Sequence, residues 1–204
     1  MPNRIKEQLA RLFIETKAFK EDLVQGFKLS SGDTSPFYVD CKALMGTPEP
    51  RQLVARLACE LVDDQALEFE VIGGLEIGAI AIATAISDYA FNLRPKREWR
   101  TFVVRKNPKE HGLRNLIEGP FNRGDRAVIV DDVLTTGGSV IKAVAAARHA
   151  GLTVNYALVI VDRNEKNGKA NVEREKVRVL SLLTIEDLRN VSKKKREELI
   201  ANQV

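Results

Sequence analysis

Short apolar runs alternate with helix-like runs through the middle of this chain, and this alternation limits the fold more than any other feature. Apolar runs typical of buried strands cover residues 71–72, 100–105, 127–130 and 153–161. Apolar residues at helical spacing fill 77–89 and 139–150. Strands that alternate with helices form a mostly parallel sheet covered by helices, and ligands bind at the carboxyl ends of its strands. We therefore expect an α/β fold with its functional site at that edge.

Further segments flank the alternating part. Apolar residues at helical spacing in 3–19 and 49–64 predict two helices, and the segment 27–40, with its SSGDTSP turn sequence, indicates a hairpin. The polar stretch 106–116 has no apolar periodicity. We expect one domain over residues 1–204.

Charge and composition argue against several classes of protein. The net charge of +4 is spread along the chain, and the densest basic cluster, residues 193–196, precedes two glutamates, as on the solvated face of a helix. We therefore expect no nucleic-acid partner. No apolar run approaches the roughly 20 residues that span a bilayer, so no membrane association is expected. Cys41 and Cys59 lack metal-ligand spacing, and without a signal peptide a cytoplasmic location with free thiols is expected.

The sequence VIVDDVLTTGGS predicts the chemistry of the site. Asp131 and Asp132 follow the buried run 127–130. Adjacent carboxylates repel each other unless hydrogen-bond donors or positive charge lie between them, and ribose hydroxyls or a Mg²⁺-bound water would supply these. The loop that follows opens a helix, whose free N–H groups and dipole favour a phosphate; it consists of Thr135, Thr136, Gly137, Gly138 and Ser139. This spacing predicts a sugar phosphate as ligand.

Three other interpretations compete for this stretch. An ATPase strand can also end in acidic residues, but no GxxxxGK[ST] loop precedes it, and the GKA sequence at 168–170 does not fit that pattern. A dinucleotide-binding GxGxxG sequence is absent. The third is a plain strand-to-helix turn with aspartates at the surface.

The same stretch resembles the phosphoribosyl pyrophosphate signature of type I phosphoribosyltransferases, which identifies the donor but not the acceptor. FVVRKNPKEHG, residues 102–112, is similar to the mobile catalytic loop of orotate phosphoribosyltransferases, R-K-x-x-K-x-H-G, which purine members of the family lack. FKLSSGDTSPFYVD looks like their base-side hairpin, and VDRNEKNG like their strand-end segment with an arginine. The resemblance extends over about residues 27–188.

The resemblance implies the type I phosphoribosyltransferase fold, with a core of about 65–170 and a small hood made of about 1–45 and the C-terminal segment. It also implies transfer of the 5-phosphoribosyl group to N1 of orotate, giving orotidine 5′-monophosphate and pyrophosphate in pyrimidine biosynthesis. It assigns donor binding to Asp131, Asp132, Val133, Leu134, Thr135, Thr136, Gly137, Gly138 and Ser139. It assigns both catalysis and donor contacts to Arg105, Lys106, Lys109 and His111. These groups would offset charge on the leaving pyrophosphate, and His111 would act either as a proton donor or as a charge alone.

The family relationship also implies a homodimer, because in this family the catalytic loop reaches into the active site of the partner subunit. For orotate, the residues it assigns are Thr135, Arg163, Tyr38 and Val39. Arg163 would hold the carboxylate of orotate with two parallel hydrogen bonds. The structural alternatives are a salt bridge from Arg163 to Asp162 or Glu165, and ordinary hairpin packing for Tyr38 and Val39.

Two positions depart from the pattern of many family members. Ser30 and Ile77 stand where lysines are common. Both changes remove positive charge from the donor pocket, so Mg²⁺ should matter more. We expect it near Asp131 and Asp132, held through the substrate and water without direct protein ligands.

Residues 73–78, GGLEIG, resemble the pyrophosphate-side loop, where glycine permits close approach of the backbone to the anion. The resemblance implies a cis peptide between non-proline residues near Leu75 and Glu76; the structural alternative is a plain strand-to-helix turn. Two other functions remain open for the whole chain. One is the same transfer to another base, and the other is a non-catalytic regulator that senses phosphoribosyl pyrophosphate.

Overall fold

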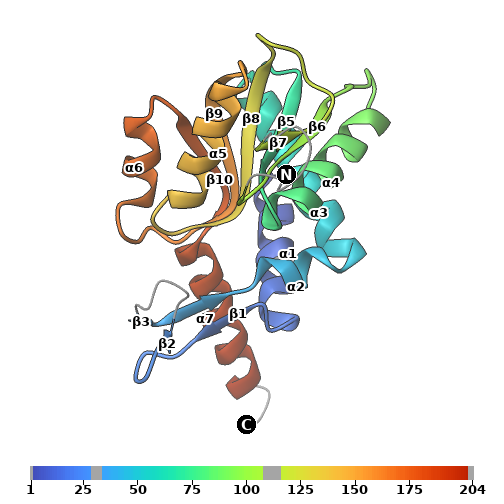
Figure 1. Ribbon diagram of the computed structural model, residues 1–204. Helices are drawn as coiled ribbons and strands as arrows, with labels where there is room; N and C mark the ends of the chain where they lie inside the picture. Colours follow the sequence, from blue (N-terminus) through green and yellow to red (C-terminus); the bar gives the residue numbers. More distant parts are fainter. Residues whose placement is uncertain (1, 29–33, 108–115, 202–204) are drawn as a thin grey trace.

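A six-stranded sheet forms the centre of the molecule (Figure 1). The computed structural model of the chain describes residues 2–28, 34–107 and 116–201. The strands of the sheet are β5 (Val71–Leu75), β6 (Arg100–Val104), β7 (Ile117–Glu118), β8 (Arg126–Leu134), β9 (Thr153–Asp162) and β10 (Arg178–Thr184). Their order is β10-β9-β8-β5-β6-β7, and every neighbouring pair is parallel except β6 with β7. The mostly parallel sheet predicted from the sequence is confirmed.

Helices cover both faces of this sheet, which explains its continuous apolar runs. Side chains of a strand point alternately to opposite faces. In β8, Val128 and Val130 accordingly join one buried cluster, and Ala127 and Ile129 join the other. The first cluster contains the helices α3 (Pro48–Asp64) and α4 (Gly78–Asn92), and the second contains α5 (Gly138–His149) and part of α6 (Gly168–Arg174).

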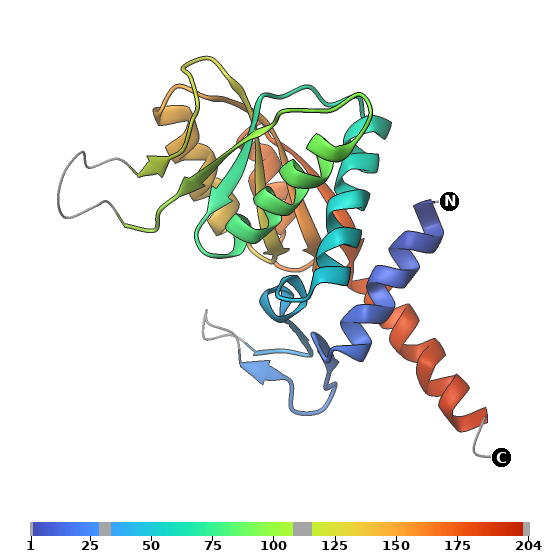
Figure 2. The same ribbon diagram turned by 90° about the vertical axis from the view of Figure 1, so that its right-hand side faces the viewer.

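The N-terminal and C-terminal segments lie together beyond one end of the sheet (Figures 1 and 2). They comprise the helices α1 (Pro2–Glu15), α2 (Cys41–Met45) and α7 (Ile185–Ala201), with the strand pairs β1 (Phe19–Glu21) with β4 (Phe37–Val39) and β2 (Phe27–Lys28) with β3 (Thr34–Ser35). Helices α1 and α7 pack against each other. The Glu21 carboxylate of β1 accepts hydrogen bonds from Arg189 and Arg196 of α7, so distant parts of the chain are joined here.

Several element boundaries differ from those expected. Strand β5 continues through Gly73 and Gly74, which the sequence placed in a tight turn. A Cβ added at Gly73 would lie 2.1 Å from the carbonyl oxygen of Phe102 on β6, so glycine allows close strand contact here instead of a turn. Strand β8 includes the two aspartates expected to follow it. Helix α1 ends at Glu15, before the expected end at residue 19, because Phe19–Glu21 pairs with β4.

The sequence did not predict α2, α6, β1, β7 or β10 as separate elements. Strand β10 extends the sheet beyond the expected core of about 65–170. Among the described residues, no helix combines the length and apolar character that crossing a membrane requires.

Candidate active site

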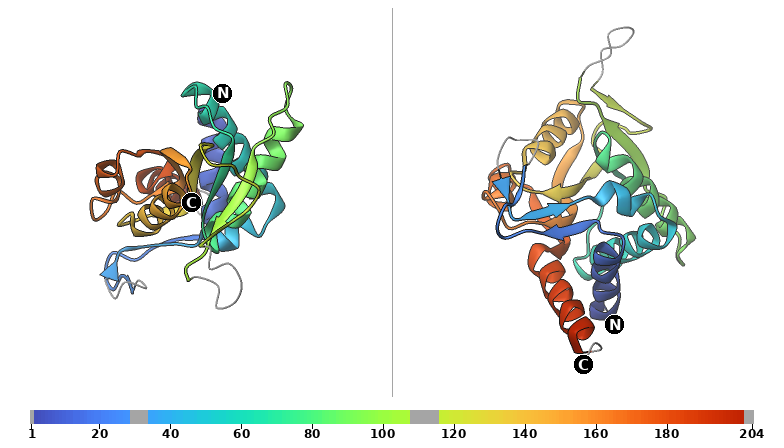
Figure 3. Two further views of the ribbon diagram at one scale, coloured as in Figure 1. Left: turned by 45° about the horizontal axis from the view of Figure 1, so that its top comes forward. Right: turned by 90° about the horizontal axis from the view of Figure 1, so that it is seen from below.

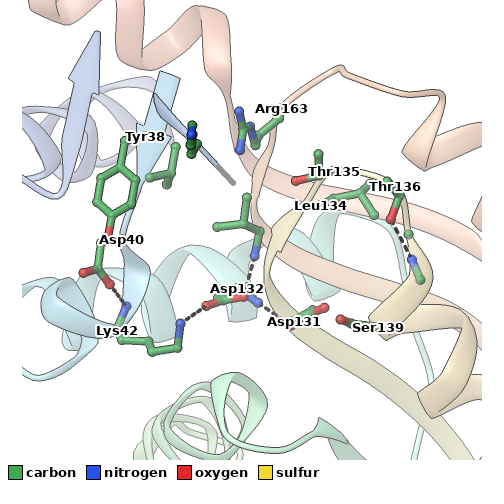
Figure 4. A pocket seen from close by; sticks show the side chains of 15 residues that line it. Tyr38, Asp40, Lys42, Asp131, Asp132, Leu134, Thr135, Thr136, Ser139 and Arg163 are labelled. Carbon is green, nitrogen blue, oxygen red and sulfur yellow. Dashed lines mark hydrogen bonds and ion pairs between the residues drawn. The ribbon is translucent and has the colours of Figure 1, made fainter. Parts of the chain in front are cut away.

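A cavity of about 520 Å³ lies at the carboxyl ends of β8 and β9 (Figure 4). It is lined by Lys28, Tyr38, Val39, Asp40, Lys42, Asp131, Asp132, Val133, Leu134, Thr135, Thr136, Gly137, Gly138, Ser139 and Arg163. The residues expected from 131–139 to hold the donor therefore share one cavity with the four expected to hold the base.

The loop between β8 and α5 turns at a glycine directly before the helix begins. Gly137 precedes the helix with a left-handed φ of 83°, and the amide of Gly138 donates to the Thr136 hydroxyl, 3.3 Å away. The outer side of the loop rests on α6, where the side-chain amide of Asn171 donates to the Thr136 carbonyl over 2.9 Å. A Cβ added at Gly168 would lie 2.3 Å from the Thr135 carbonyl oxygen. The loop is thus fixed from outside, with the N-terminus of α5 at the cavity.

Near the end of β8, Asp131 lies in an environment that penalises its charge, and Asp132 is its immediate neighbour. The Asp132 amide donates to the Asp131 carboxylate over 3.0 Å, and the Val133 amide donates to the Asp132 carboxylate over 2.9 Å. Burial, followed by the neighbouring Asp132 carboxylate, raises the pKa of Asp131 to about 7. Hydrogen-bond donors or a cation bound in the cavity would relieve this cost.

Arg163 lies directly after β9, and its side chain is only 5 % exposed. Its Nη2 donates to the Ser35 hydroxyl, to the Phe37 carbonyl oxygen over 3.1 Å, and to the Glu165 carboxylate, 3.0 Å away. The ion pair with Glu165 that the sequence left as an alternative is therefore present. The Nε of Arg163 is buried and has no hydrogen-bond partner among the described residues, so part of the guanidinium can still serve a ligand.

The base-side residues Tyr38 and Val39 differ in their surroundings. Tyr38 is 38 % exposed, and its ring lies 5.8 Å from that of Phe27. Val39 is partly buried and packs against the main core cluster. Hairpin packing therefore accounts for Val39 more fully than for Tyr38, whose ring remains open to the cavity side (Figure 4).

Two of the expected catalytic residues lie elsewhere in the same chain. Arg105 and Lys106 line a second cavity of about 780 Å³, between β6, β7 and α5. The Arg105 guanidinium pairs with Glu118 at 3.2 Å, and the Lys106 amide donates to Glu76 over 2.8 Å. The structure does not bring Arg105 and Lys106 to the aspartates. Lys109, His111 and Ser30 lie outside the described residues.

The segment between β5 and α4 approaches the aspartates from another direction. Its non-proline cis peptide joins Glu76 to Ile77, one bond beyond the position expected. Ile77 is 72 % exposed and brings no charge. A Cβ at Gly78 would lie 3.2 Å from Cγ of Asp132, so glycine lets the start of α4 come close to that carboxylate.

Sequence reasoning missed three residues of the cavity: Lys28, Asp40 and Lys42. Asp40 caps α2, where its carboxylate accepts from the amides of Lys42 and Ala43 over 3.1 and 3.2 Å. An aspartate directly before a short apolar run is a typical start of a helix, and this signal could have predicted both α2 and the position of Lys42.

The described residues of the cavity do not form a complete set of ligands for a metal ion. Across residues 2–28, 34–107 and 116–201, no three His, Cys, Asp or Glu side chains group in a way that would hold one. Asp131 and Asp132 form a carboxylate pair, which suits a cation that keeps most of its water and arrives with an anionic ligand.

Comparison with known proteins places the chain among similar sequences and folds. Residues 42–191 match the model of the phosphoribosyl transferase domain family. The orotate phosphoribosyltransferase of Aquifex aeolicus is 40 % identical over 183 residues, covering 90 % of this chain and 97 % of the other. The orotate phosphoribosyltransferase of Pyrococcus furiosus is 36 % identical over 184 residues, covering 90 % and 95 %.

Solved structures show the same likeness. Orotate phosphoribosyltransferase from Mycobacterium tuberculosis H37Rv, solved in complex with Fe(III) dicitrate, matches with a TM-score of 0.75 and 34 % identity, covering 90 % of this chain and 98 % of the other. The same enzyme in complex with 5-phospho-alpha-D-ribosyl 1-diphosphate matches with a TM-score of 0.70 and 30 % identity, covering 91 % and 92 %.

Proposed function

The chain belongs to the orotate phosphoribosyltransferases, within the phosphoribosyl transferase domain family, and on this basis we infer that it is an enzyme of pyrimidine biosynthesis. It transfers the 5-phosphoribosyl group of phosphoribosyl pyrophosphate to N1 of orotate, and it releases orotidine 5′-monophosphate and pyrophosphate. One observation carries this function: an acidic pair, an anion-type loop and a buried arginine line a single cavity.

The donor binds along β8 and the start of α5. Backbone amides of Thr135, Thr136, Gly137, Gly138 and Ser139 hold its 5′-phosphate, assisted by the α5 dipole. Asp131 and Asp132 accept hydrogen bonds from the ribose hydroxyls. Val133 and Leu134 contribute the backbone that joins these two sets. The raised pKa of Asp131 supports this assignment, because hydroxyl donors offset the cost of its buried charge.

Orotate binds on the other side of the ribose. Arg163 pairs with its carboxylate through the part of the guanidinium that Ser35, Phe37 and Glu165 leave free. The Thr135 hydroxyl lies near the same carboxylate. Tyr38 and Val39 cover the base, Tyr38 with its exposed ring and Val39 with its backbone. A buried arginine recognises a carboxylate well, because its fixed fork of donors matches two oxygens.

A homodimer supplies the catalytic loop. In one chain, Arg105 and Lys106 line a cavity separate from that of Asp131 and Asp132, and this separation supports a loop contributed by the second subunit. Arg105, Lys106, Lys109 and His111 then surround the pyrophosphate, and they exclude water when the loop closes. Active sites shared across the interface would explain why Arg105 and Lys106 line a different cavity from the aspartates of their own chain.

The same groups stabilise the charges that develop as the reaction proceeds. C1′ becomes cation-like while the pyrophosphate gains negative charge, so the site must stabilise both ends of the breaking bond. The carboxylates beside the ribose favour the positive end, and the basic loop favours the negative end. Arg163 and Tyr38 orient N1 of orotate toward C1′. Asp131 and Asp132 would lie near a Mg²⁺ ion held through the donor and water, and this ion would neutralise part of the pyrophosphate charge.

The chain works as one domain in the cytoplasm, with residues of about 1–45 and the C-terminal segment as a hood over the site. The strand pair β1–β4 and helix α7, which contact each other through Glu21, support this division. Cys41 and Cys59 are free thiols, as is usual in a reducing compartment.

The test is the formation of orotidine 5′-monophosphate from orotate and phosphoribosyl pyrophosphate, followed by the loss of orotate absorbance, with Mg²⁺ present and with EDTA. Orotate should be consumed only with Mg²⁺, and uracil and hypoxanthine should react far more slowly. Turnover of hypoxanthine without turnover of orotate would assign the chain to another base. Binding of the donor without turnover of any base would indicate a regulator.

A further inference from the structure

The main cavity receives a highly charged anion but offers few cations. Among the described residues that line it, the cationic side chains are Lys28, Lys42 and Arg163. Nη2 of Arg163 already pairs with Glu165. Lys42 is the cation placed next to the aspartates, since its Nζ lies 4.0 Å from the Asp132 carboxylate.

The backbone around Lys42 is fixed, whereas its side chain is free to move. Its amide is bound to the Asp40 cap, and the neighbouring Cys41 is buried with Sγ 3.8 Å from the Asp132 carbonyl oxygen. The Lys42 side chain is 71 % exposed. An exposed ion pair of this kind stabilises the fold little. Lys42 can therefore leave Asp132 and pair with a bound anion with little loss of stability.

Lys42 and the phosphate loop lie on opposite sides of the aspartate pair. Figure 4 shows Ser139 and the Thr136 loop on one side of the aspartate pair and Lys42 on the other. The donor carries its 5′-phosphate and its pyrophosphate at opposite ends of the ribose. With the phosphate at the α5 N-terminus and the hydroxyls at the aspartates, the pyrophosphate falls beside Lys42.

We propose that Lys42 binds the pyrophosphate group of the donor and stabilises it as the leaving group; this inference rests on the proposed function. A lysine ammonium is a compact point charge that pairs well with phosphate oxygens. Ile77, in the segment that approaches Asp132, is apolar and cannot supply this charge. Lys42 comes from the same subunit as the aspartates, so its contact with the pyrophosphate does not require a loop from a second chain.

Isothermal titration calorimetry with three ligands separates this role from others. The ligands are phosphoribosyl pyrophosphate, pyrophosphate and ribose 5-phosphate, each with Mg²⁺, and the variants are Lys42→Met and Lys42→Arg. Lys193→Met is a matched control, because Lys193 also lies on a helix, is 77 % exposed and pairs with a carboxylate at 4.0 Å. Thermal melting checks that each variant folds.

Lys42→Met should raise the Kd of phosphoribosyl pyrophosphate and of pyrophosphate by about tenfold or more, the loss of one charge-assisted contact. Its Kd for ribose 5-phosphate should stay within about twofold, Lys42→Arg should retain most of the affinity, and Lys193→Met should match the wild type. Equal weakening of all three ligands, or no weakening of pyrophosphate, would overturn the proposal. Failure of the wild type itself to bind the donor would overturn the proposed function along with it.

Discussion

At the scale of one residue, the buried Asp131 carboxylate suits the proposed ribose site but lowers the stability of the fold when it is charged. Burial and the adjacent Asp132 raise the pKa of its carboxyl group to about 7, far above that of an unfolded aspartate. The folded chain therefore binds this proton more tightly than the unfolded chain. The contribution of Asp131 to stability is largest at low pH, and it is lost as the pH rises from about 4 to about 7. Above about pH 7 the Asp131 carboxylate carries a charge that the fold does not favour.

Asp131→Asn should therefore raise the free energy of unfolding at about pH 8 by roughly 1–3 kcal/mol and have a smaller effect near pH 5. The asparagine oxygen can still accept the Asp132 amide, so the local hydrogen bond is kept. Urea unfolding at both pH values measures the change, and the exposed Asp64→Asn variant serves as the control. A variant less stable than the wild type at pH 8 would show that the Asp131 charge is well compensated in the fold.

Gly137 carries a second prediction at this scale. Its φ of 83° disfavours any residue with a Cβ, and a Cβ here would lie 2.7 Å from Cγ2 of Val172. Gly137→Ala should lower the free energy of unfolding by about 1–3 kcal/mol. Gly138→Ala is the matched comparison, because its Cβ would meet only the Thr136 hydroxyl, at 3.6 Å. Thermal or urea melts measure both, and equal stability of the two variants would argue against the left-handed requirement at Gly137.

At the scale of elements, Arg163 at the end of β9 contacts the strands β3 and β4 of the hairpin. The Ser35 hydroxyl accepts from Arg163 and donates to Glu165 over 3.1 Å, although 128 residues separate Ser35 from Arg163. Ser35 thus positions the guanidinium, although Ser35 itself does not line the cavity. The hood and the sheet are joined at the proposed orotate site, so a shift of the hairpin would move Arg163.

Ser35→Ala should raise KM for orotate by about three- to tenfold and change KM for phosphoribosyl pyrophosphate much less, because it removes one hydrogen bond that orients Arg163. Ser87→Ala is a suitable control, since it deletes a half-buried hydroxyl that donates to the Trp99 carbonyl away from the cavity. Steady-state kinetics with each substrate varied in turn measure the two KM values separately. A similar rise in both KM values would point to a general disturbance of the fold.

The sequence predicted those elements whose signal is local. The apolar run, acidic pair and TTGGS loop of 127–139 predicted a strand, an anion loop and a helix, and the structure brings them together as expected. Pairing of β1 with β4 and the contact of Arg163 with Ser35 join segments that share no local pattern, so a single sequence does not indicate them. The prediction of a tight turn at the glycines of β5 was wrong, because glycine is as common in turns as where two strands approach closely.

At the scale of the whole molecule, the two cavities divide the proposed active site. The donor residues expected from 131–139 and the expected base residues line one, and Arg105 and Lys106, the described part of the basic loop, line the other. Figure 3 shows from below how α1 and α7 lie beside the β1–β4 pair at one end of the sheet. In the homodimer proposed above, the loop of a second subunit completes the site.

Mixed dimers test this arrangement. Lys109→Ala and Arg163→Ala should each reduce turnover strongly, and Lys109→Ala should alter stability little because the change falls in a polar stretch. In a heterodimer of the two variants, one site combines an intact loop with an intact base pocket, so part of the activity should return. Activity assays on tagged, purified heterodimers measure the recovery. No recovery would indicate that loop and base pocket belong to the same chain.

The most direct test of the account is a crystal structure with phosphoribosyl pyrophosphate and Mg²⁺ bound. The 5′-phosphate should lie within hydrogen-bonding distance of the amides of residues 135–139, with the ribose hydroxyls on Asp131 and Asp132. A donor bound elsewhere, with these amides contacting no phosphate, would contradict the central claim that this edge of the parallel sheet holds the sugar phosphate.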